Sequence, residues 1–362
     1  MKKLFAISAL AVLAPAFAPA AYAQSSVTVY GIVDLGVSMD DRGNGVGRSY
    51  EVKNGFMSGS RLGFRGQEDL GNGWKALFNI EQAISADNGT ITSYAGQPGS
   101  TATGVGWNRK SVVGLSGPWG MVTLGRDYTP FFYSSLNTDN LALGLYGSNL
   151  NQVAMNAGVS ENFHRASNGV FYETLPIAGL TLRAFGTAGA ETPDGNQRML
   201  GLGGDYRLGG LLASVGYQTN KIVAPTAAAT GKRKDFVGGA KYRFGDFSVG
   251  AGYARVDPPG GNNDITSAWF GGAYYTGPHT VLAQVGQMKF DAPTAAGEGK
   301  GKSFGVAYTY GFSKQTTAYV TYGRVSNTGT SRLNLYAAAA SVTANGAGAD
   351  PTGLGVGIRK TF

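Results

Sequence analysis

Apolar and polar residues alternate along most of the chain after Gln24. This pattern predicts β-strands, because successive side chains of a strand point to opposite faces. Between Val27 and Ser38, Val, Leu and Gly occupy every second position, with mostly polar side chains between them. The last nine residues, Leu354 to Phe362, have an apolar row that ends in Phe and a second row of Gly, Arg and Thr. Such paired rows are typical of a strand with lipid on one side and water on the other.

The alternating segments predict sixteen strands, joined in turn by short and long connections. We expect short connections near 69–73, 117–120, 175–179, 208–210, 244–246, 276–279 and 310–313, and long ones near 39–55, 86–106, 129–160, 190–197, 221–234, 257–265, 291–301 and 326–350. Bacterial outer-membrane barrels have even strand numbers, short periplasmic turns and long outer loops. The sequence therefore predicts a 16-stranded antiparallel transmembrane β-barrel.

A soluble β-sandwich or propeller is the alternative architecture, since it also has many strands and turns. Its outward row would be polar, whereas here one row is rich in Val, Phe, Tyr and Trp along nearly every strand. After Gln24 no apolar run approaches the roughly 20 residues of a membrane helix, and lipid tolerates only closed sheets. Aromatic residues near the short turns predict a girdle at one membrane interface; they are Trp74, Trp119, Tyr242, Phe244, Tyr274, Tyr275, Tyr310 and Phe312.

The N-terminus predicts a secretory signal peptide. Lys2 and Lys3 precede an apolar run, and Ala21-Tyr22-Ala23 is a small-x-small cleavage site. We therefore assign 1–23 to the signal peptide and 24–362 to a single barrel. The chain has no Cys, which excludes disulfides and a lipoprotein anchor.

Composition argues against several other kinds of function. The net charge is +8, but Lys and Arg are scattered singly, which does not favour a nucleic-acid partner. His164 and His279 are far apart and lack metal-ligand spacing, so we expect no metal and no cofactor. An outer-membrane enzyme with a Ser–His pair is an alternative class, but no nucleophile motif surrounds either His. A structural or adhesive barrel without conductance is a third possibility.

Three segments resemble general porins of the type found in Burkholderia- and Neisseria-like proteobacteria. They are VTVYGIVD from Val27 to Asp34, SRLGFRGQEDLG from Ser60 to Gly71, and VTLGRDY from Val122 to Tyr128, together with the terminal Phe362. The resemblance covers essentially the whole chain after the signal peptide. It implies a homotrimer in the outer membrane, with a water-filled pore in each subunit for small solutes and ions. It also implies a third outer loop that folds into the pore, and a terminal Phe that the assembly machinery recognises.

The segment 129–160 matches that third loop in position and length. Enterobacterial relatives carry Pro-Glu-Phe-Gly at the loop tip, whereas this chain has an apolar stretch between Asp139 and Gly144. A loop carboxylate of the relatives is therefore missing, which weakens the case for cation preference.

Strand parity predicts which charged residues line the pore. If Leu62 and Phe64 face lipid, Arg61 and Arg65 face the interior, and the same argument turns Lys75 and Glu81 inward. A second set follows from the strand that begins near Trp107, where Arg109 and Ser111 are expected to face inward.

By resemblance, Arg61 and Arg109 match the basic wall of the pore constriction, Glu81 an acidic residue beside it, and Asp139 a loop carboxylate opposite it. The predicted constriction comprises Arg61, Arg65, Lys75, Glu81, Arg109 and Asp139. The excess of positive charge predicts a channel that prefers anions. A solute-specific channel, or arginines that only brace the barrel wall, remain as alternatives.

Overall fold

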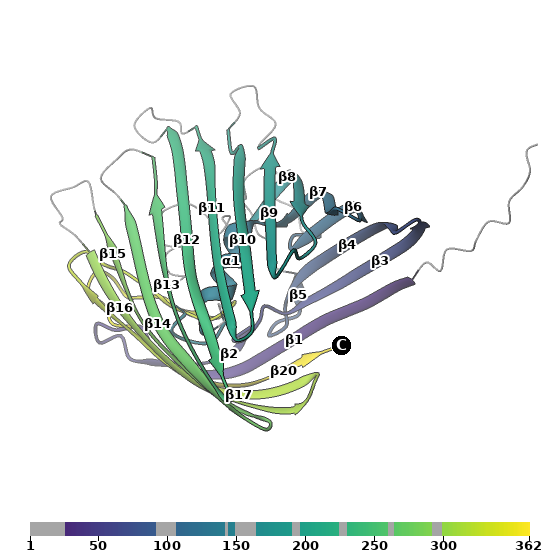
Figure 1. The fold of residues 1–362 in the computed structure, drawn as a ribbon. Helices are drawn as coiled ribbons and strands as arrows, with labels where there is room; N and C mark the ends of the chain where they lie inside the picture. Colours follow the sequence, from purple (N-terminus) through teal and green to yellow (C-terminus); the bar gives the residue numbers. More distant parts are fainter. Residues whose placement is uncertain are drawn as a thin grey trace, which may run out of the picture.

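The chain forms a closed β-barrel (Figure 1). The structure is a computed structural model that describes residues 26–91, 106–141, 144–148, 164–189, 196–223, 230–259, 264–291 and 299–362. The predicted signal peptide, 1–23, lies outside the described residues. No helix among the described residues is long and apolar enough to span a membrane.

The first half of the barrel contains β1 to β9 and one helix. Its elements are β1 (Ser26–Asp41), β2 (Arg48–Asn54), β3 (Arg61–Gly71), β4 (Trp74–Ser85), β5 (Thr90–Ile91), β6 (Lys110–Gly117), β7 (Gly120–Tyr128), α1 (Pro130–Thr138), β8 (Arg165–Glu173) and β9 (Leu180–Thr187).

The second half contains the remaining strands. They are β10 (Met199–Leu208), β11 (Leu211–Ile222), β12 (Gly231–Phe244), β13 (Phe247–Asp257), β14 (Ile265–Thr276), β15 (His279–Phe290), β16 (Gly299–Ser313), β17 (Thr316–Thr328), β18 (Leu335–Tyr336), β19 (Ser341–Val342) and β20 (Thr352–Thr361).

Sixteen antiparallel strands make up the described wall, as predicted. β2 and β3 are two parts of one wall strand, because β2 pairs with residues 35–41 of β1 and β3 with residues 26–32. β5 is a two-residue extension beside β4, and β18 and β19 pair only with each other. The ring closes where β1 pairs with β20 along residues 32–41.

Strands extend beyond their expected positions in several places. β2 (Arg48–Asn54) lies within 39–55, a segment expected to be a loop, and pairs there with the end of β1. The last short turn lies between Ser313 and Thr316 rather than at 310–313, because a bulge near Gly311 allows β16 to continue. β12 begins at Gly231, inside a segment expected to be a loop. There the alternation of inner and outer side chains continues, but Lys replaces apolar residues in the outer row.

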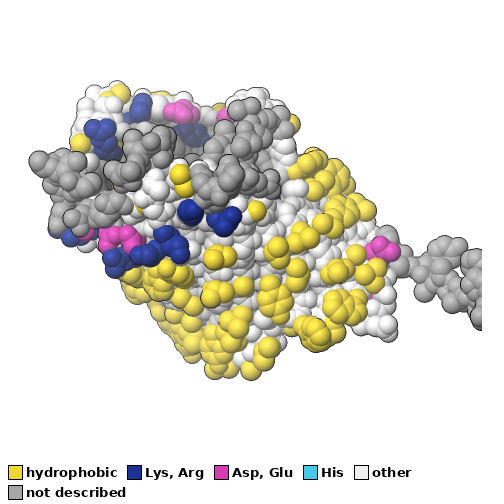
Figure 2. Space-filling model, turned by 90° about the horizontal axis from the view of Figure 1, so that it is seen from above, with side chains coloured by type: hydrophobic (Ala, Val, Ile, Leu, Met, Phe, Trp, Pro, Cys, Tyr) yellow, Lys and Arg dark blue, Asp and Glu magenta, His cyan; other side chains and the backbone are white. Residues whose placement is uncertain are grey.

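The two faces of the wall have opposite character, which confirms the predicted alternation. Val27, Val29 and Val37 on β1 are more than half exposed, whereas Asp34 and Ser38 in the alternate row are buried inside the barrel. Figure 2 shows apolar side chains spread over the outer wall. The aromatic girdle is present beside the short turns, where Trp74, Trp119, Tyr242, Phe244, Tyr274 and Phe312 are exposed.

One residue of the expected girdle points the other way. Tyr275 stacks under Arg243, with 4.4 Å between the guanidinium carbon and the ring centroid, and its hydroxyl lies 3.4 Å from Ser248 Oγ. Arg243 alternates with exposed Tyr242 and Phe244, so this group is on the inner face. Two adjacent aromatics of one strand cannot both face lipid, so Tyr274 takes the outer position.

The chain end closes the barrel at its first strand. Gly31 and Phe362 exchange two backbone hydrogen bonds of 3.1 Å each. The exposed Phe362 ring covers Gly31, where an added Cβ would lie 2.4 Å from the ring Cζ. The ring therefore covers backbone that would otherwise face lipid.

We expect Phe362→Ala to reduce the amount of folded protein in the outer membrane without changing conductance in the molecules that fold. The ring covers the seam between the first and last strands, while its side chain is remote from the inner face. The measurement is the heat-modifiable fraction in isolated outer membranes. Ile358→Ala on the outer row of the same strand is the control; an equal loss in both variants would mean that only apolar area matters.

Two inward-folded segments occupy the barrel beneath the long loops. Helix α1 packs inside against β9 to β13, and Figure 1 shows it behind the wall strands. Thr129 caps its first turn by accepting a hydrogen bond from the Phe132 amide, and Pro130 occupies the first turn. The hairpin of β18 and β19 packs into the interior as well. Its Leu335 and Val342 belong to one buried apolar cluster with Phe131 of α1.

Candidate functional site

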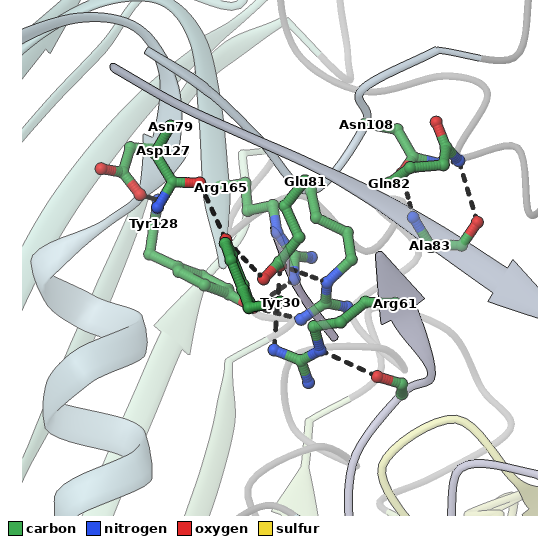
Figure 3. A network of polar contacts seen from close by, with 12 residues as sticks. Tyr30, Arg61, Asn79, Glu81, Gln82, Ala83, Asn108, Asp127, Tyr128 and Arg165 are labelled. Atoms are coloured by element: carbon green, nitrogen blue, oxygen red, sulfur yellow. Dashed lines mark hydrogen bonds and ion pairs between the residues drawn. The ribbon is translucent and has the colours of Figure 1, made fainter. Parts of the chain in front are cut away.

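A group of charged side chains meets on the inner face of β3 and β4. The register places Gly63 opposite Glu81 and Arg61 opposite Ala83, so Arg61 and Glu81 are diagonal neighbours. Figure 3 shows Arg61, Glu81 and Tyr30 pointing toward one another. The inward positions that parity predicted for Arg61 and Glu81 are therefore those found in the structure.

Glu81 is the acidic centre of this group. Its Oε1 accepts a hydrogen bond from Arg109 Nε at 2.6 Å and lies 3.8 Å from Arg61 Nη1. Its Oε2 lies 3.3 Å from the Tyr30 hydroxyl, which also donates to Asn79 Oδ1 at 2.8 Å. Glu81 is 7% exposed, so its charge is balanced by protein groups rather than by bulk water.

Arg65 belongs to the same inner row. Its guanidinium carbon lies 5.2 Å from the centroid of the Tyr30 ring, within range of a cation–π contact. Because the Tyr30 hydroxyl also contacts Glu81, the ring connects Arg65 to the acidic centre.

Arg109 joins the group, although the strand argument that placed it there was wrong. β6 begins only at Lys110, and Ser111 pairs with Ile80 in the same row as the exposed Val113. Ser111 therefore faces outward, contrary to the prediction. Lys110 takes the inner position and pairs with Asp127 at 2.9 Å. Arg109 precedes the strand, so the alternation does not apply to its side chain, which turns toward Glu81.

Tyr128 and Arg165 complete the group, and sequence reasoning missed both. The Tyr128 hydroxyl accepts hydrogen bonds from Arg109 Nη2 at 2.7 Å and Arg165 Nη2 at 2.5 Å. The Arg165 guanidinium carbon also lies 4.3 Å from the Tyr128 ring centroid, and Figure 3 shows the two together. Tyr128 ends the VTLGRDY segment, which was noted without a role for this residue. Arg165 is the first residue of β8 and follows a long loop. No preceding strand residue shows which face its side chain takes, so the alternation could not place it.

Lys75 lies in the inner row of β4 but far from the group. In the strand register it stands opposite Asp69, beside the short turn. It lies six residues from Glu81 along the same strand. At about 3.3 Å per residue the two are about 20 Å apart. The structure thus does not bring Lys75 to the other predicted residues.

Asp139 was expected to face the basic wall, and this was wrong. It follows α1 and is fully buried. Its carboxylate accepts hydrogen bonds from Ser148 Oγ at 2.5 Å and from the Leu141 amide at 2.8 Å, and its carbonyl oxygen accepts one from Lys241 Nζ. Burial raises the pKa of this carboxyl, and the Ser148 hydrogen bond opposes that change. Asp139 therefore holds the inward-folded segment in shape rather than facing the interior space.

Glycines of the wall seat the inward-folded segment. An added Cβ at Gly203 or Gly216 would lie 2.8 Å from Pro130 or Phe131 of α1, so no larger residue fits beneath the helix. Further along, the buried Tyr146 donates from its hydroxyl to Asp40 Oδ1 at 3.0 Å and from its amide to Thr321 Oγ1 at 3.0 Å. The segment is thus fastened to the wall at both described ends.

The local charge of the group is positive. Arg61 and Arg109 contact the one carboxylate of the group, Glu81. Arg65 is connected to it through Tyr30, and Arg165 through Tyr128 and Arg109. Lys110 and Asp127 balance each other. Four guanidinium groups against one carboxylate leave an excess of three positive charges. Chemically, such a group attracts anions and repels cations.

Comparison with known proteins identifies the family. The profile of the Gram-negative porins matches residues 9–330. The chain belongs to the Gram-negative porin family. It is an outer-membrane porin, whose closed barrel encloses a channel for small hydrophilic solutes.

Individual relatives agree with this assignment. Outer membrane porin protein 32 of Delftia acidovorans is 32% identical, with both chains covered completely. An outer membrane porin protein of Bordetella pertussis is 27% identical over 97% of this porin and 98% of that protein. Among solved structures, an anion-selective porin from Comamonas acidovorans has a TM-score of 0.79 at 29% identity, covering 94% of this chain and 100% of that one.

Proposed function

We propose that this porin prefers anions and that Arg61, Arg65, Arg109 and Arg165, opposed by Glu81, set this preference at its constriction. The observation that carries the proposal is the excess of positive charge in that group. Two unit charges about 6 Å apart interact by ~3 kcal/mol at an effective dielectric constant near 20. Tenfold selectivity requires only about 1.4 kcal/mol. The similarity to a solved anion-selective porin supports the same sign.

The remaining parts of the proposal concern maturation and assembly. We infer that 1–23 is removed as a signal peptide, that the barrel machinery recognises the C-terminal strand, and that three copies assemble in the membrane. The barrel of OmpT from Vibrio cholerae, solved in a trimer form, supports the fold of such an assembly at a TM-score of 0.68. Cross-linking of purified protein measures the number of subunits.

A channel without enzymatic activity agrees with the surroundings of the two histidines. The His164 ring packs against Phe132, and the His279 ring against Tyr308 and Tyr310. Among the residues that the structure describes, neither ring forms a hydrogen bond to a serine hydroxyl, as a base beside a serine nucleophile would. A solute-specific channel is the second candidate, and competition by solutes in the same conductance experiment distinguishes it.

The deciding experiment is conductance in a planar bilayer. We expect steps that group in threes and, in a KCl gradient, a reversal potential of the sign given by a chloride-preferring pore. A reversal potential on the cation side would contradict the charge argument while leaving the pore intact. An absence of conductance from folded trimers would contradict the channel itself.

A further inference from the structure

Helix α1 turns apolar side chains toward the enclosed space of the barrel. The side of the helix that packs on the wall is buried, and the opposite side is partly exposed and consists of Phe132, Tyr133, Leu136 and Asn137. Tyr133 lies under Arg183, and Asn137 donates to Asp205, so these two contact charged residues of the wall. Phe132 and Leu136 are one helical turn apart. They form an apolar face toward the channel, here called the inner helix face.

The inner helix face adjoins the arginine group through Tyr128. The Tyr128 ring stacks on Phe132, with 4.0 Å between the ring centroids and 9° between the ring planes. The guanidinium carbon of Arg165 lies 4.3 Å from the same Tyr128 centroid (Figure 3). Phe132 and Arg165 cannot both fit above one face of the ring, so they cover opposite faces. The apolar surface therefore begins one ring away from the guanidinium groups.

The helix does not neutralise the arginines across the channel. α1 contains no charged residue, and Asp139 directly after it is fully buried. On the other side, Arg65 is exposed and forms no ion pair among the described residues. One side of the enclosed space thus offers guanidinium groups, and the other offers an aromatic and an aliphatic side chain. A small polar anion can use only the first of these surfaces.

We propose that, among anions of equal charge and similar size, the channel preferentially binds those that carry an aromatic ring. The carboxylate lies at the arginines, where charge-assisted hydrogen bonds hold it, and the ring packs on Phe132 and Leu136. This inference rests on the proposed anion preference and adds a class of solute to it.

Tyr128 shows how such a solute fits. Its oxygen accepts hydrogen bonds from Arg109 and Arg165, while its ring stacks on Phe132. An aromatic carboxylate has the same layout, with oxygen atoms at one end and a flat apolar ring at the other. Contact between its ring and the inner helix face removes apolar surface from water, which a polyhydroxy anion cannot do.

The test measures how strongly added carboxylates reduce the chloride current of purified porin in a planar bilayer. The probes are benzoate and threonate, a polyhydroxy carboxylate of similar size and the same charge. We expect benzoate to bind about two- to tenfold more tightly, because a contact between aromatic rings is worth about that factor. Neutral benzamide should bind more weakly than benzoate. Equal binding of benzoate and threonate, or of benzoate and benzamide, would overturn the proposal.

Replacing Phe132 and Leu136 by Gln removes the inner helix face without changing any charge. The double variant is expected to lose most of the difference between benzoate and threonate. A matched control, Tyr275→Gln, removes an inner aromatic ring that stacks on Arg243 near the short turns, away from α1. It should keep the wild-type difference. Equal loss in both variants, or loss in neither, would overturn the proposal. If the double variant does not fold, Leu136→Gln alone should reduce the difference.

The reversal potential in a KCl gradient separates this inference from the proposed function. A wild-type channel that prefers chloride to potassium but binds benzoate and threonate equally would retain the anion preference and lose the aromatic preference. A reversal potential on the cation side would contradict the anion preference itself, and with it the inference that depends on it.

Discussion

Replacing both Arg61 and Arg109 by glutamate is expected to change the channel from one that prefers anions to one that prefers cations. The wild-type group has four arginines against Glu81. The double variant leaves Arg65 and Arg165 against three carboxylates, so the local charge falls from plus three to minus one. At ~3 kcal/mol per pair of charges about 6 Å apart, this change exceeds the roughly 1.4 kcal/mol of tenfold selectivity. The reversal potential in a KCl gradient measures the result.

A graded series separates charge from structure. Arg61→Gln with Arg109→Gln leaves a charge of plus one and should give an intermediate reversal potential. Lys75→Glu with Arg243→Glu makes the same charge change as the glutamate double variant, but in inner positions near the short turns. We expect it to shift the reversal potential much less. If the folded glutamate double variant retained wild-type selectivity, the arginines would be braces that hold Glu81 and the wall together.

The barrel could be predicted from the sequence because lipid imposes one rule on every strand. Most outward positions within the membrane are apolar, so parity is visible in the residues themselves. The rule also fixed Arg61, Arg65 and Glu81, because the apolar residues next to them (Leu62, Phe64 and Ile80) mark the outer row. The outer face of the barrel and its inner charged row thus follow from the same alternation.

Prediction failed where that rule stops applying. Arg109 lies one residue before β6, and extending the alternation to it reversed the assignment of Ser111. β12 begins beyond the apolar band with Lys in its outer row. Its first residues, from Gly231, therefore looked like part of a loop. At both places the strand leaves the apolar band, and the sequence no longer distinguishes the two faces.

Asp139 shows a second limit. A carboxylate in a loop that folds inward can either line the open channel or hold the loop in place. The sequence does not distinguish these two roles. Here Ser148 and Leu141 supply the hydrogen bonds, and only the folded loop brings Ser148 close. The partner of Arg165 is likewise brought close only by folding. This partner, Tyr128, lies 37 positions earlier in the sequence, before a long loop.

The second large effect concerns the fastening of that loop. Tyr146→Ala is expected to raise single-channel conductance, weaken anion preference and lower stability. Tyr146 is fully buried, its ring packs edge-on to Phe56 at 5.4 Å between centroids, and its hydroxyl bonds Asp40. Truncating a buried aromatic residue to Ala costs about 3–5 kcal/mol. The detached loop would let ions pass farther from the arginines.

Two further variants test whether the ring or its hydroxyl holds the loop. Tyr146→Phe keeps the ring and loses one hydrogen bond, worth about 1 kcal/mol, so conductance should stay close to wild type. Gly323→Val acts from the wall, where an added Cβ would lie 2.7 Å from Tyr146 Cβ. It should therefore raise conductance as Tyr146→Ala does, without touching the loop sequence. Wild-type conductance in both Tyr146→Ala and Gly323→Val would mean that the rest of the segment, seated through α1 on Gly203 and Gly216, keeps its position alone.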